Sequence, residues 1–371
     1  MPLFIDQDQS MLRDTAREFM ASEGSISGQL RKYRDMNCKD GFGHALWRQF
    51  GEMGFTGILV DEADGGLGLG HVEAGIVLEE IGRNLTPSPF LITSVAAVEA
   101  LRGTPLRQRW LPGILSGETV AALAVDEGPK HRPEALSMQA ERSGNGFRLS
   151  GRKQFVVQGA SADFFVVAAK AREGLTLFLV EKEARGLSVE GVRLADSSIG
   201  ARLDFANVEI DADAVVGEVG QGAPVLSRVL NGARAGAASE MVGVASGAMA
   251  MTVDYLKQRK QFGRLIGEFQ ALQHRAAHLY SELEIARASA LKAQQLLDEH
   301  SDEAEAMVSV AKAKAGRVST LAVQEGVQMH GGIGMTDEYD IGLYMKRDRV
   351  LNELFGDPNY HADRLARLKG Y

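Results

Sequence analysis

Two separated stretches of the chain decide which fold its sequence specifies. Residues 255–264 read YLKQRKQFGR, with Phe269-Gln270 shortly after them, and residues 328–334 read QMHGGIG. The first stretch has four cations around Gly263, namely Lys257, Arg259, Lys260 and Arg264. Cations complement the dipole at the C-terminal end of a helix, so we expect a helix that ends at this glycine. In the second, paired glycines after a helix let a phosphate or a ring approach the backbone closely. An arginine, glutamine amides and glycine amides together suit a nucleotide's pyrophosphate and adenine, although each stretch alone is equally compatible with a structural role.

Outward from these stretches, the 371 residues divide into three compositional blocks that we expect to be domains. Residues 1–117 carry apolar positions at helical spacing and predict a helical domain, in which Pro112-Gly113 ends a helix. Residues 118–213 alternate short apolar runs with turns, which is typical of a β-barrel or sandwich, and residues 214–371 return to long helices typical of a bundle. Strands are expected at residues 120–125, 147–149, 155–157, 164–168, 175–180 and 189–194. The expected fold class is therefore α+β and multidomain.

The composition excludes several classes of protein. Hydrophobic residues make up 45% and charged residues 24%, as in ordinary globular proteins, and the net charge of -8 argues against a nucleic-acid binder. Cys38 is the single cysteine, so no internal disulfide forms and a reducing compartment, the cytoplasm, is expected. The longest apolar stretch, residues 235–251, is interrupted by Glu240, so no membrane span is predicted. Its many small residues suit close contact between helices instead.

Two other patterns are compatible with a ligand site. The glycine-rich loop at residues 64–70 lacks the G-x-G-x-x-G spacing, because residue 71 is His71, and we interpret it as a surface loop. His274, His278 and Glu282 share one helix face, but the H-E-x-x-H pattern is absent. We interpret them as a packed or interfacial face and predict no metal site.

Taken together, the motifs resemble those of the acyl-CoA dehydrogenase family, over nearly the whole chain. Residues 259–263 followed by Phe269-Gln270 resemble its R-x-Q-F-G…F-Q signature, residues 328–332 its Q-x-x-G-G segment, and residues 64–70 its N-terminal glycine loop. The order of the blocks fits the family's fold, an N-terminal helical domain, a middle β-barrel domain and a C-terminal four-helix bundle. The resemblance implies that an acyl-CoA thioester is oxidised between Cα and Cβ with FAD as cofactor. It also implies an electron-transfer flavoprotein as electron acceptor.

The resemblance also implies where FAD binds, because in this family FAD lies between the subunits of a tetramer. The residues expected to contact an FAD bound mainly to another subunit are Arg259, Gln261, Phe262, Gly263, Gln270, Gln328, Gly331 and Gly332. At this chain's own flavin, Phe155 stands where the family has a tryptophan. Val157 replaces a threonine that bonds the flavin, and valine has no hydrogen-bonding group.

The catalytic base is the main departure from the family pattern. The usual glutamate position aligns with Gly356, whose neighbour Asp357 is expected to point elsewhere, and the alternative base position aligns with Ala233. Arg234 matches a family arginine and is a candidate for the substrate site. Glu240 lies two helical turns after Ala233, on the same helix face. It has two interpretations: a displaced catalytic base, or a structural ion-pair partner.

Residues that reach a neighbour's FAD are present, whereas those that serve the chain's own flavin are altered. This pattern resembles the smaller subunit of two-component acyl-CoA dehydrogenases of steroid side-chain or dicarboxylate degradation, as do residues 354–357 (LFGD) and 269–274 (FQALQH). We therefore expect one subunit type of a heteromeric tetramer, whose partner supplies the base. The alternatives are a self-sufficient homotetramer that uses Glu240, a non-catalytic binding or scaffold module, and a monooxygenase-type use of the fold.

Overall fold

The computed structural model describes residues 3–371, which form two compact units. One unit contains the described residues up to Arg31 together with His71–Thr86 and Arg234–Tyr371; the other contains Lys32–Gly70 and Pro87–Ala233. Among residues 3–371, no helix is both long enough and apolar enough to span a bilayer.

Two predicted N-terminal helices belong to the first unit and pack on each other. Helix α1 (Gln7–Ser22) begins at Asp6, whose carboxylate accepts the Gln9 N–H while the Gln9 side chain accepts the Asp6 N–H. This reciprocal pair is a capping box, which satisfies two N–H groups that the helix leaves open. Helix α4 (His71–Asn84) contacts α1, and the carboxylate of Asp298 accepts its first two N–H groups.

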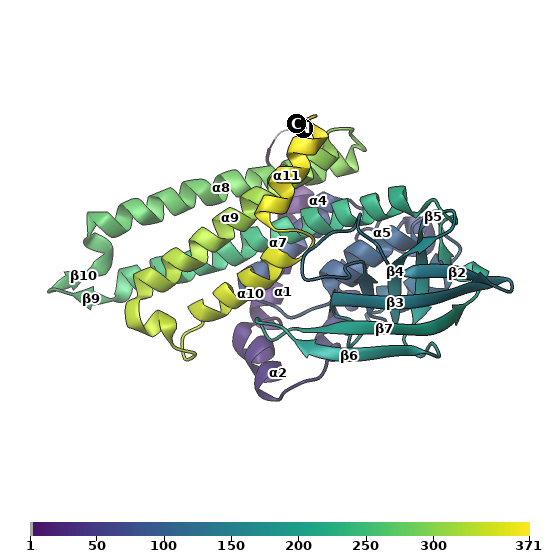
Figure 1. The fold of residues 1–371 in the computed structure, drawn as a ribbon. Helices are drawn as coiled ribbons and strands as arrows, with labels where there is room; N and C mark the ends of the chain where they lie inside the picture. Colours follow the sequence, from purple (N-terminus) through teal and green to yellow (C-terminus); the bar gives the residue numbers. More distant parts are fainter. Residues whose placement is uncertain (1–2) are drawn as a thin grey trace. The chain divides into compact units, whose positions relative to one another are not determined.

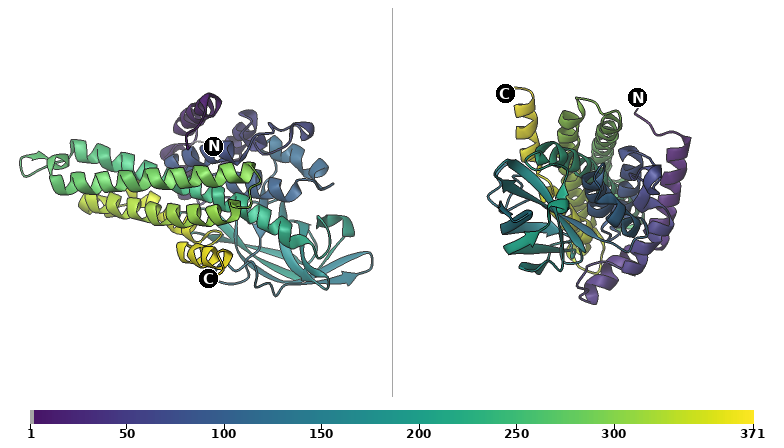
Figure 2. Two further views of the ribbon diagram at one scale, coloured as in Figure 1. Left: turned by 90° about the horizontal axis from the view of Figure 1, so that it is seen from above. Right: turned by 90° about the vertical axis from the view of Figure 1, so that its right-hand side faces the viewer.

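The C-terminal bundle confirms the predicted long helices. It consists of α7 (Gly222–Gln258, inside this unit from Arg234 on), α8 (Gln270–Asp298), α9 (Ala304–His330) and α10 (Ile341–Glu353). Helix α9 contacts α8, α10 and the short C-terminal α11 (Pro358–Leu368), and the long helices run side by side in both views (Figures 1 and 2). The small residues of α7 serve close helix contact as expected: a Cβ on Gly243 would lie 2.0 Å from the Glu79 carbonyl oxygen of α4.

The prediction that a helix ends at Gly263 is wrong. Helix α7 ends at Gln258, and a hairpin of β9 (Lys260–Gln261) and β10 (Arg264–Leu265) follows. Phe262 and Gly263 form its two-residue turn with φ of 53° and 82°. Positive φ at both turn positions matches the twist of a hairpin, so this glycine serves the turn and not a helix cap. The hairpin and a short 3₁₀ turn, η6 (Ile266–Glu268), connect α7 to α8.

The second unit is built around the predicted β domain, a sheet of eight strands. The strands are β1 (Ala121–Ala124), β2 (Gln139–Ser143), β3 (Gly146–Val157), β4 (Phe164–Ala171), β5 (Gly174–Glu181), β6 (Leu187–Arg193), β7 (Ile199–Ile210) and β8 (Val215–Val216). Their order is β6-β7-β3-β2-β4-β5-β8, with β1 paired in parallel to β4. Phe147, Leu149, Phe165 and Phe178 belong to the core that this sheet buries.

Three details of this unit differ from the sequence predictions. The expected strands at 147–149 and 155–157 are one strand, β3, which crosses two irregularities in its pairing with β7. Strands β2 and β7 were not predicted, because exposed charged residues interrupt their apolar pattern. Strand β8 was not predicted because its two residues are too short for a pattern. Helix α6 (Arg107–Leu115) continues through Pro112, and Gly113 is needed there because a Cβ would lie 2.1 Å from Thr119 Oγ1.

Further helices complete this unit. They are α2 (Lys32–Asp35), α3 (His44–Glu52), the turns η2 (Phe55–Gly57) and η3 (Glu62–Asp64), the π-helical η4 (Leu91–Ala97), α5 (Val98–Leu101) and η5 (Ala212–Ala214). Trp47 and Phe50 of α3 are buried, and Trp47 Nε1 donates to the Thr119 carbonyl oxygen at 3.3 Å.

Candidate functional site

The two motif stretches meet at one end of the helical bundle. Leu256 of α7, Ile266 of η6 and Met329 of α9 form one small buried cluster, against which Tyr255 and Phe269 pack. In Figure 1 the β9–β10 hairpin lies at the same end of α8 as this cluster. Residues about 70 positions apart in sequence therefore share one surface, which we call the bundle end.

All eight residues expected to reach a neighbouring subunit's FAD are exposed at the bundle end: Arg259, Gln261, Phe262, Gly263, Gln270, Gln328, Gly331 and Gly332. Phe262 is 93% exposed. A Cβ on Gly263, Gly331 or Gly332 would meet no atom within 4 Å. None of the ion pairs described for residues 3–371 involves Arg259. The surface is thus open to a group that approaches from outside the chain.

A buried histidine, His330, packs against Tyr255 at the bundle end. The His330 ring stacks on Tyr255 with centroids 4.5 Å apart, and its Nδ1 lies 2.6 Å from the Gly326 carbonyl oxygen. A carbonyl only accepts, so Nδ1 carries the proton, and burial lowers the pKa of His330 below its ordinary 6.5. Its Nε2 is buried and has no hydrogen-bond partner within the described part of the chain.

The α10–α11 turn, residues 354–357, is the opposite kind of environment. Lys312 Nζ donates to the carbonyl oxygens of Leu351 at 2.9 Å and Gly356 at 3.1 Å. The Phe355 carbonyl oxygen accepts from Arg234 Nε at 3.2 Å and lies 3.1 Å from His361 Nε2. Three buried basic side chains therefore converge on the backbone of one short turn.

Burial weakens the positive charge of this cluster. Burial, together with the nearby Arg234 guanidinium, lowers the pKa of Lys312 to about 7. Burial likewise lowers the pKa of Arg234 to about 10 and holds the pKa of His361 far below its usual range. His361 is consequently neutral, and Arg234 is the permanently charged member.

Gly356 has no room for a side chain. Its φ is +106°, and a Cβ would lie 2.3 Å from Cδ1 of Tyr360. The Tyr360 hydroxyl accepts from Arg234 Nη2 at 3.1 Å, which fixes the ring in that place. Asp357 points away, as expected, because its carboxylate caps α11 by accepting the N–H groups of Asn359 and Tyr360.

Glu240 lies in a buried ion pair within the bundle. Its Oε1 accepts from Arg347 Nε at 2.8 Å and Nη2 at 2.5 Å, and Glu240 is 2% exposed. The interpretation of Glu240 as an ion-pair partner matches this contact.

The positions expected beside the chain's own flavin lie at the end of β3. Phe155 has φ of 51° within an irregular stretch of β3 and is half-buried, and Val157 is buried. Lys153, fully buried, donates to Glu127 Oε1 at 2.8 Å and to the Val125 carbonyl oxygen at 3.0 Å. Burial lowers the pKa of Lys153, and the Glu127 carboxylate partly counters that effect.

Comparison with known protein families identifies the family of this chain. Models of the acyl-CoA dehydrogenase N-terminal, middle and C-terminal domains match residues 6–118, 123–211 and 220–369. The chain belongs to the acyl-CoA dehydrogenase family.

Relatives extend the match over nearly the whole chain. A mitochondrial isovaleryl-CoA dehydrogenase of Solanum tuberosum is 33% identical over 327 residues, 83% of this chain and 78% of that protein. A variant of the Tcur3481-Tcur3483 steroid ACAD is 31% identical, with a TM-score of 0.90 over 98% of each chain. The ChsE4-ChsE5 complex from Mycobacterium tuberculosis is 25% identical, with a TM-score of 0.92 over 100% of each chain.

Acyl-CoA dehydrogenases bind FAD, and the bundle end fits part of that cofactor. A guanidinium and amide side chains can bind a pyrophosphate and an adenine, and the side-chain-free glycines leave space for them. At β3, Phe155 offers an aromatic face, whereas Val157 offers no hydrogen bond.

Sequence reasoning missed three residues that contact the α10–α11 turn: Lys312 of α9, and Tyr360 and His361 of α11. One signal for Lys312 was available, since it lies among buried residues of α9 that recur at helical spacing (Val308, Ala311, Ala315 and Ser319). A lysine on such a face needs buried acceptors. The contact between Tyr360 and Gly356 depends on a backbone geometry with no sequence signal.

Proposed function

We propose that this chain is the subunit of a two-component, FAD-dependent acyl-CoA dehydrogenase that completes its partner's FAD site and leaves the base to that partner. The substrate is an acyl-CoA thioester of lipid or steroid catabolism, and the electrons pass to an electron-transfer flavoprotein. FAD, when bound, supplies the acceptor for the hydride leaving Cβ. The chain's own residues position the pyrophosphate and adenine.

One observation carries the proposal: the backbone at Gly356 cannot hold a base. In family members a carboxylate at the aligned position removes the α-proton. Here Tyr360 fills the space next to the Gly356 Cα, so the geometry excludes any longer side chain there without rebuilding the turn. The α-proton must then be taken by a carboxylate from another chain or another position.

The exposed bundle end supports the same assignment. Arg259 and the open glycines are exposed to solvent. A ligand that uses them is therefore held mainly by another molecule. The names of two solved relatives, the Tcur3481-Tcur3483 steroid ACAD and the ChsE4-ChsE5 complex, agree with an assembly of two components.

The test is the FAD content and native mass of the chain purified alone, and again after co-expression with a base-containing subunit of this family. We expect little FAD alone and a flavin-containing heteromer after co-expression. A stable homotetramer that holds one FAD per subunit and is reduced by acyl-CoA would overturn the proposal.

The second candidate function, a self-sufficient enzyme with Glu240 as base, is tested by Glu240→Gln in the co-expressed complex. If Glu240 only pairs with Arg347, kcat changes less than about 3-fold, while thermal stability drops because a half-buried guanidinium loses its counter-charge. Arg347→Gln breaks the same pair but leaves the carboxylate in place. A loss of kcat that is confined to Glu240→Gln would transfer the catalytic role to Glu240.

A further inference from the structure

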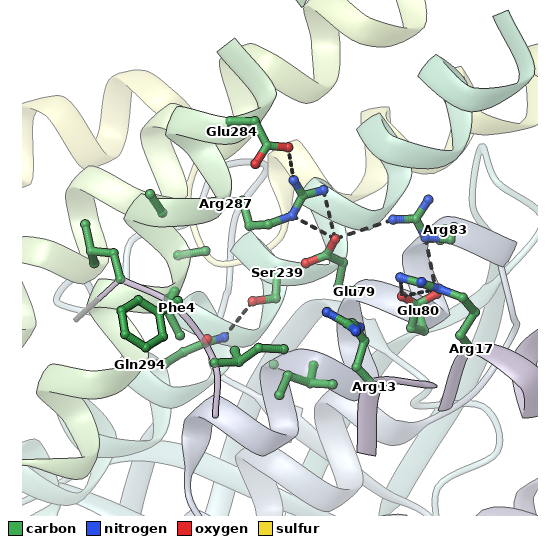
Figure 3. Close-up of a pocket in the computed structure, with 17 residues that line it drawn as sticks. Phe4, Arg13, Arg17, Glu79, Glu80, Arg83, Ser239, Glu284, Arg287 and Gln294 are labelled. Atoms are coloured by element: carbon green, nitrogen blue, oxygen red, sulfur yellow. Dashed lines mark hydrogen bonds and ion pairs between the residues drawn. The ribbon is translucent and has the colours of Figure 1, made fainter. Parts of the chain in front are cut away.

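A cavity unrelated to the two environments above lies within the first unit, between α1, α4, α7 and α8 (Figure 3). Its volume is about 460 Å³, and residues 3–5 line one side of it. Cavities that bind small molecules measure about 300–1,000 Å³, so its size suits a small ligand.

The charged residues of this cavity balance except for one arginine. Its lining contains four arginines (Arg13, Arg17, Arg83, Arg287) and three glutamates (Glu79, Glu80, Glu284). Arg17 pairs with Glu80 at 2.7 Å, Arg83 with Glu80 at 3.2 Å, and Arg287 with Glu79 at 3.0 Å as well as with Glu284. The three glutamates are thus held by three arginines from the cavity itself.

Arg13 is the remaining cation. In Figure 3 it is the labelled arginine that no dashed line joins to another residue drawn. Its ion pair is with Asp14 at 3.0 Å, and Asp14 is 65% exposed and does not line the cavity. Such an exposed pair contributes little free energy, so the guanidinium can exchange this partner for a ligand's carboxylate at small cost.

The rest of the lining is largely apolar. Leu3, Phe4, Ile76, Ala288 and Leu291 contribute hydrocarbon, and Phe4 is 71% exposed. Two polar side chains also line the cavity. Gln294 Nε2 donates to Ser239 Oγ at 2.6 Å, so these two groups satisfy each other beside the apolar wall. An apolar ligand body in this cavity would cover surface that Phe4 and Leu3 otherwise expose to water.

We propose that this cavity binds a small amphiphilic carboxylate, with its carboxylate on Arg13 and its unbranched hydrocarbon tail against Ile76, Ala288 and Leu291. The site takes a free acid and no thioester chemistry occurs in it. A planar guanidinium is suited to a carboxylate because it can donate two parallel hydrogen bonds. The proposal does not depend on the function assigned to the bundle end.

Calorimetric titration of the purified full-length protein with octanoate tests this site. Arg13→Gln is expected to weaken octanoate binding at least about 10-fold, since the charge-assisted hydrogen bonds to Arg13 are lost. Ala288→Trp, which fills the apolar wall, is expected to abolish the same binding event. Octan-1-ol, which has the tail without the charge, should bind at least 10-fold more weakly than octanoate.

A matched control separates the site from general charge effects. Arg142 also pairs with an exposed carboxylate, Glu173, but lies outside the cavity, so Arg142→Gln should leave octanoate binding unchanged. Equal octanoate affinity in the wild type, Arg13→Gln and Ala288→Trp would overturn the proposal. So would an equal loss in Arg13→Gln and Arg142→Gln, or equal binding of octan-1-ol and octanoate.

Discussion

The α10–α11 turn and the bundle end lie in the same unit but have opposite physical character. At the turn, Arg234, Lys312 and His361 are buried, and their side chains bond backbone carbonyl oxygens. At the bundle end, Arg259, Gln328 and the glycines are exposed to solvent. One region is closed by its own contacts, whereas the other exposes the polar groups that we propose bind FAD.

This difference explains how one fold can serve as half of a site. A buried cluster of basic groups is stable only when each donor has an acceptor, and here the carbonyl groups of Phe355 and Gly356 in the turn accept from all three side chains. The cluster therefore fixes a backbone path in which position 356 must be glycine. At the bundle end, the Arg259 side chain has no ion pair described in residues 3–371, so changing it should disturb the fold little.

The largest effect is expected when a side chain is added at Gly356 in the α10–α11 turn. We expect Gly356→Glu to lower the free energy of unfolding by about 4 kcal/mol, from the positive φ and the clash with Tyr360. It should add no acyl-CoA-dependent flavin reduction to that of the wild-type complex. Chemical denaturation and a flavin-bleaching assay of the co-expressed complex measure the two effects.

A matched pair of alanine variants separates backbone strain from the clash. Gly356→Ala and Gly103→Ala both place a Cβ at positive φ, but a Cβ at Gly103 meets no atom within 4 Å. We expect Gly356→Ala to cost about 2 kcal/mol more than Gly103→Ala. Equal costs, or turnover gained by Gly356→Glu, would show that Tyr360 does not close this position.

The next effect comes from the lysine that holds the turn. Lys312→Met leaves two buried carbonyl oxygens, of Leu351 and Gly356, without this donor, and should cost about 3 kcal/mol of stability. Lys314 on the same helix pairs with Glu282 near the surface, so Lys314→Met should cost less than about 1 kcal/mol. Thermal and urea denaturation of both variants measure the difference. Similar losses of unfolding free energy would contradict the role of Lys312 in holding the turn.

The same lysine predicts how stability depends on pH. The folded-state pKa of Lys312 is about 7, below its ordinary 10.5, so between these values the unfolded chain binds a proton that the native chain does not. Stability attributable to this group therefore rises with pH from about 7 to 10.5, by at most about 1.4 kcal/mol per pH unit. Asp348 and Arg234 face the same ammonium and modulate the slope.

Comparing the wild type with Lys312→Met isolates this contribution. The difference between their unfolding free energies should grow as pH rises from 7 to 9. In this range the wild type takes up a proton at Lys312 when it unfolds, whereas methionine takes up none. A difference that is constant with pH would mean that Lys312 keeps its ordinary pKa in the folded chain.

The sequence predicted the two regions unequally. The three-block order, the long helices and the meeting of residues 259–263 with residues 328–332 follow from local patterns and motifs, and the structure brings those segments together through Leu256, Ile266 and Met329. The Glu240–Arg347 pair joins positions 107 apart. Sequence offered an ion pair as one reading of Glu240 but could not identify its partner.

The remaining differences arise where the backbone geometry decides. Gly263 looked like a helix end because cations precede it, but its positive φ serves a hairpin turn. Gly356 looked like a missing glutamate, whereas the structure shows a position that Tyr360 occupies. The backbone φ of each glycine, and the packing of Tyr360 against Gly356, explain these two positions. Neither feature can be read from the residues next to the glycine in the sequence.

The smallest structural effect is expected at the open region, and there it is coupled to function. Arg259→Gln removes an exposed charge with no ion pair described in residues 3–371, so the free energy of unfolding should change by less than about 0.5 kcal/mol. In the co-expressed complex, however, the loss of a charged contact to the pyrophosphate should weaken FAD retention about 10-fold or more. Flavin fluorescence during dilution measures this retention, and Arg13→Gln, distant from the bundle end, is the control. A stability loss as large as that of Lys312→Met, or unchanged FAD retention, would show that Arg259 supports the fold and not the cofactor.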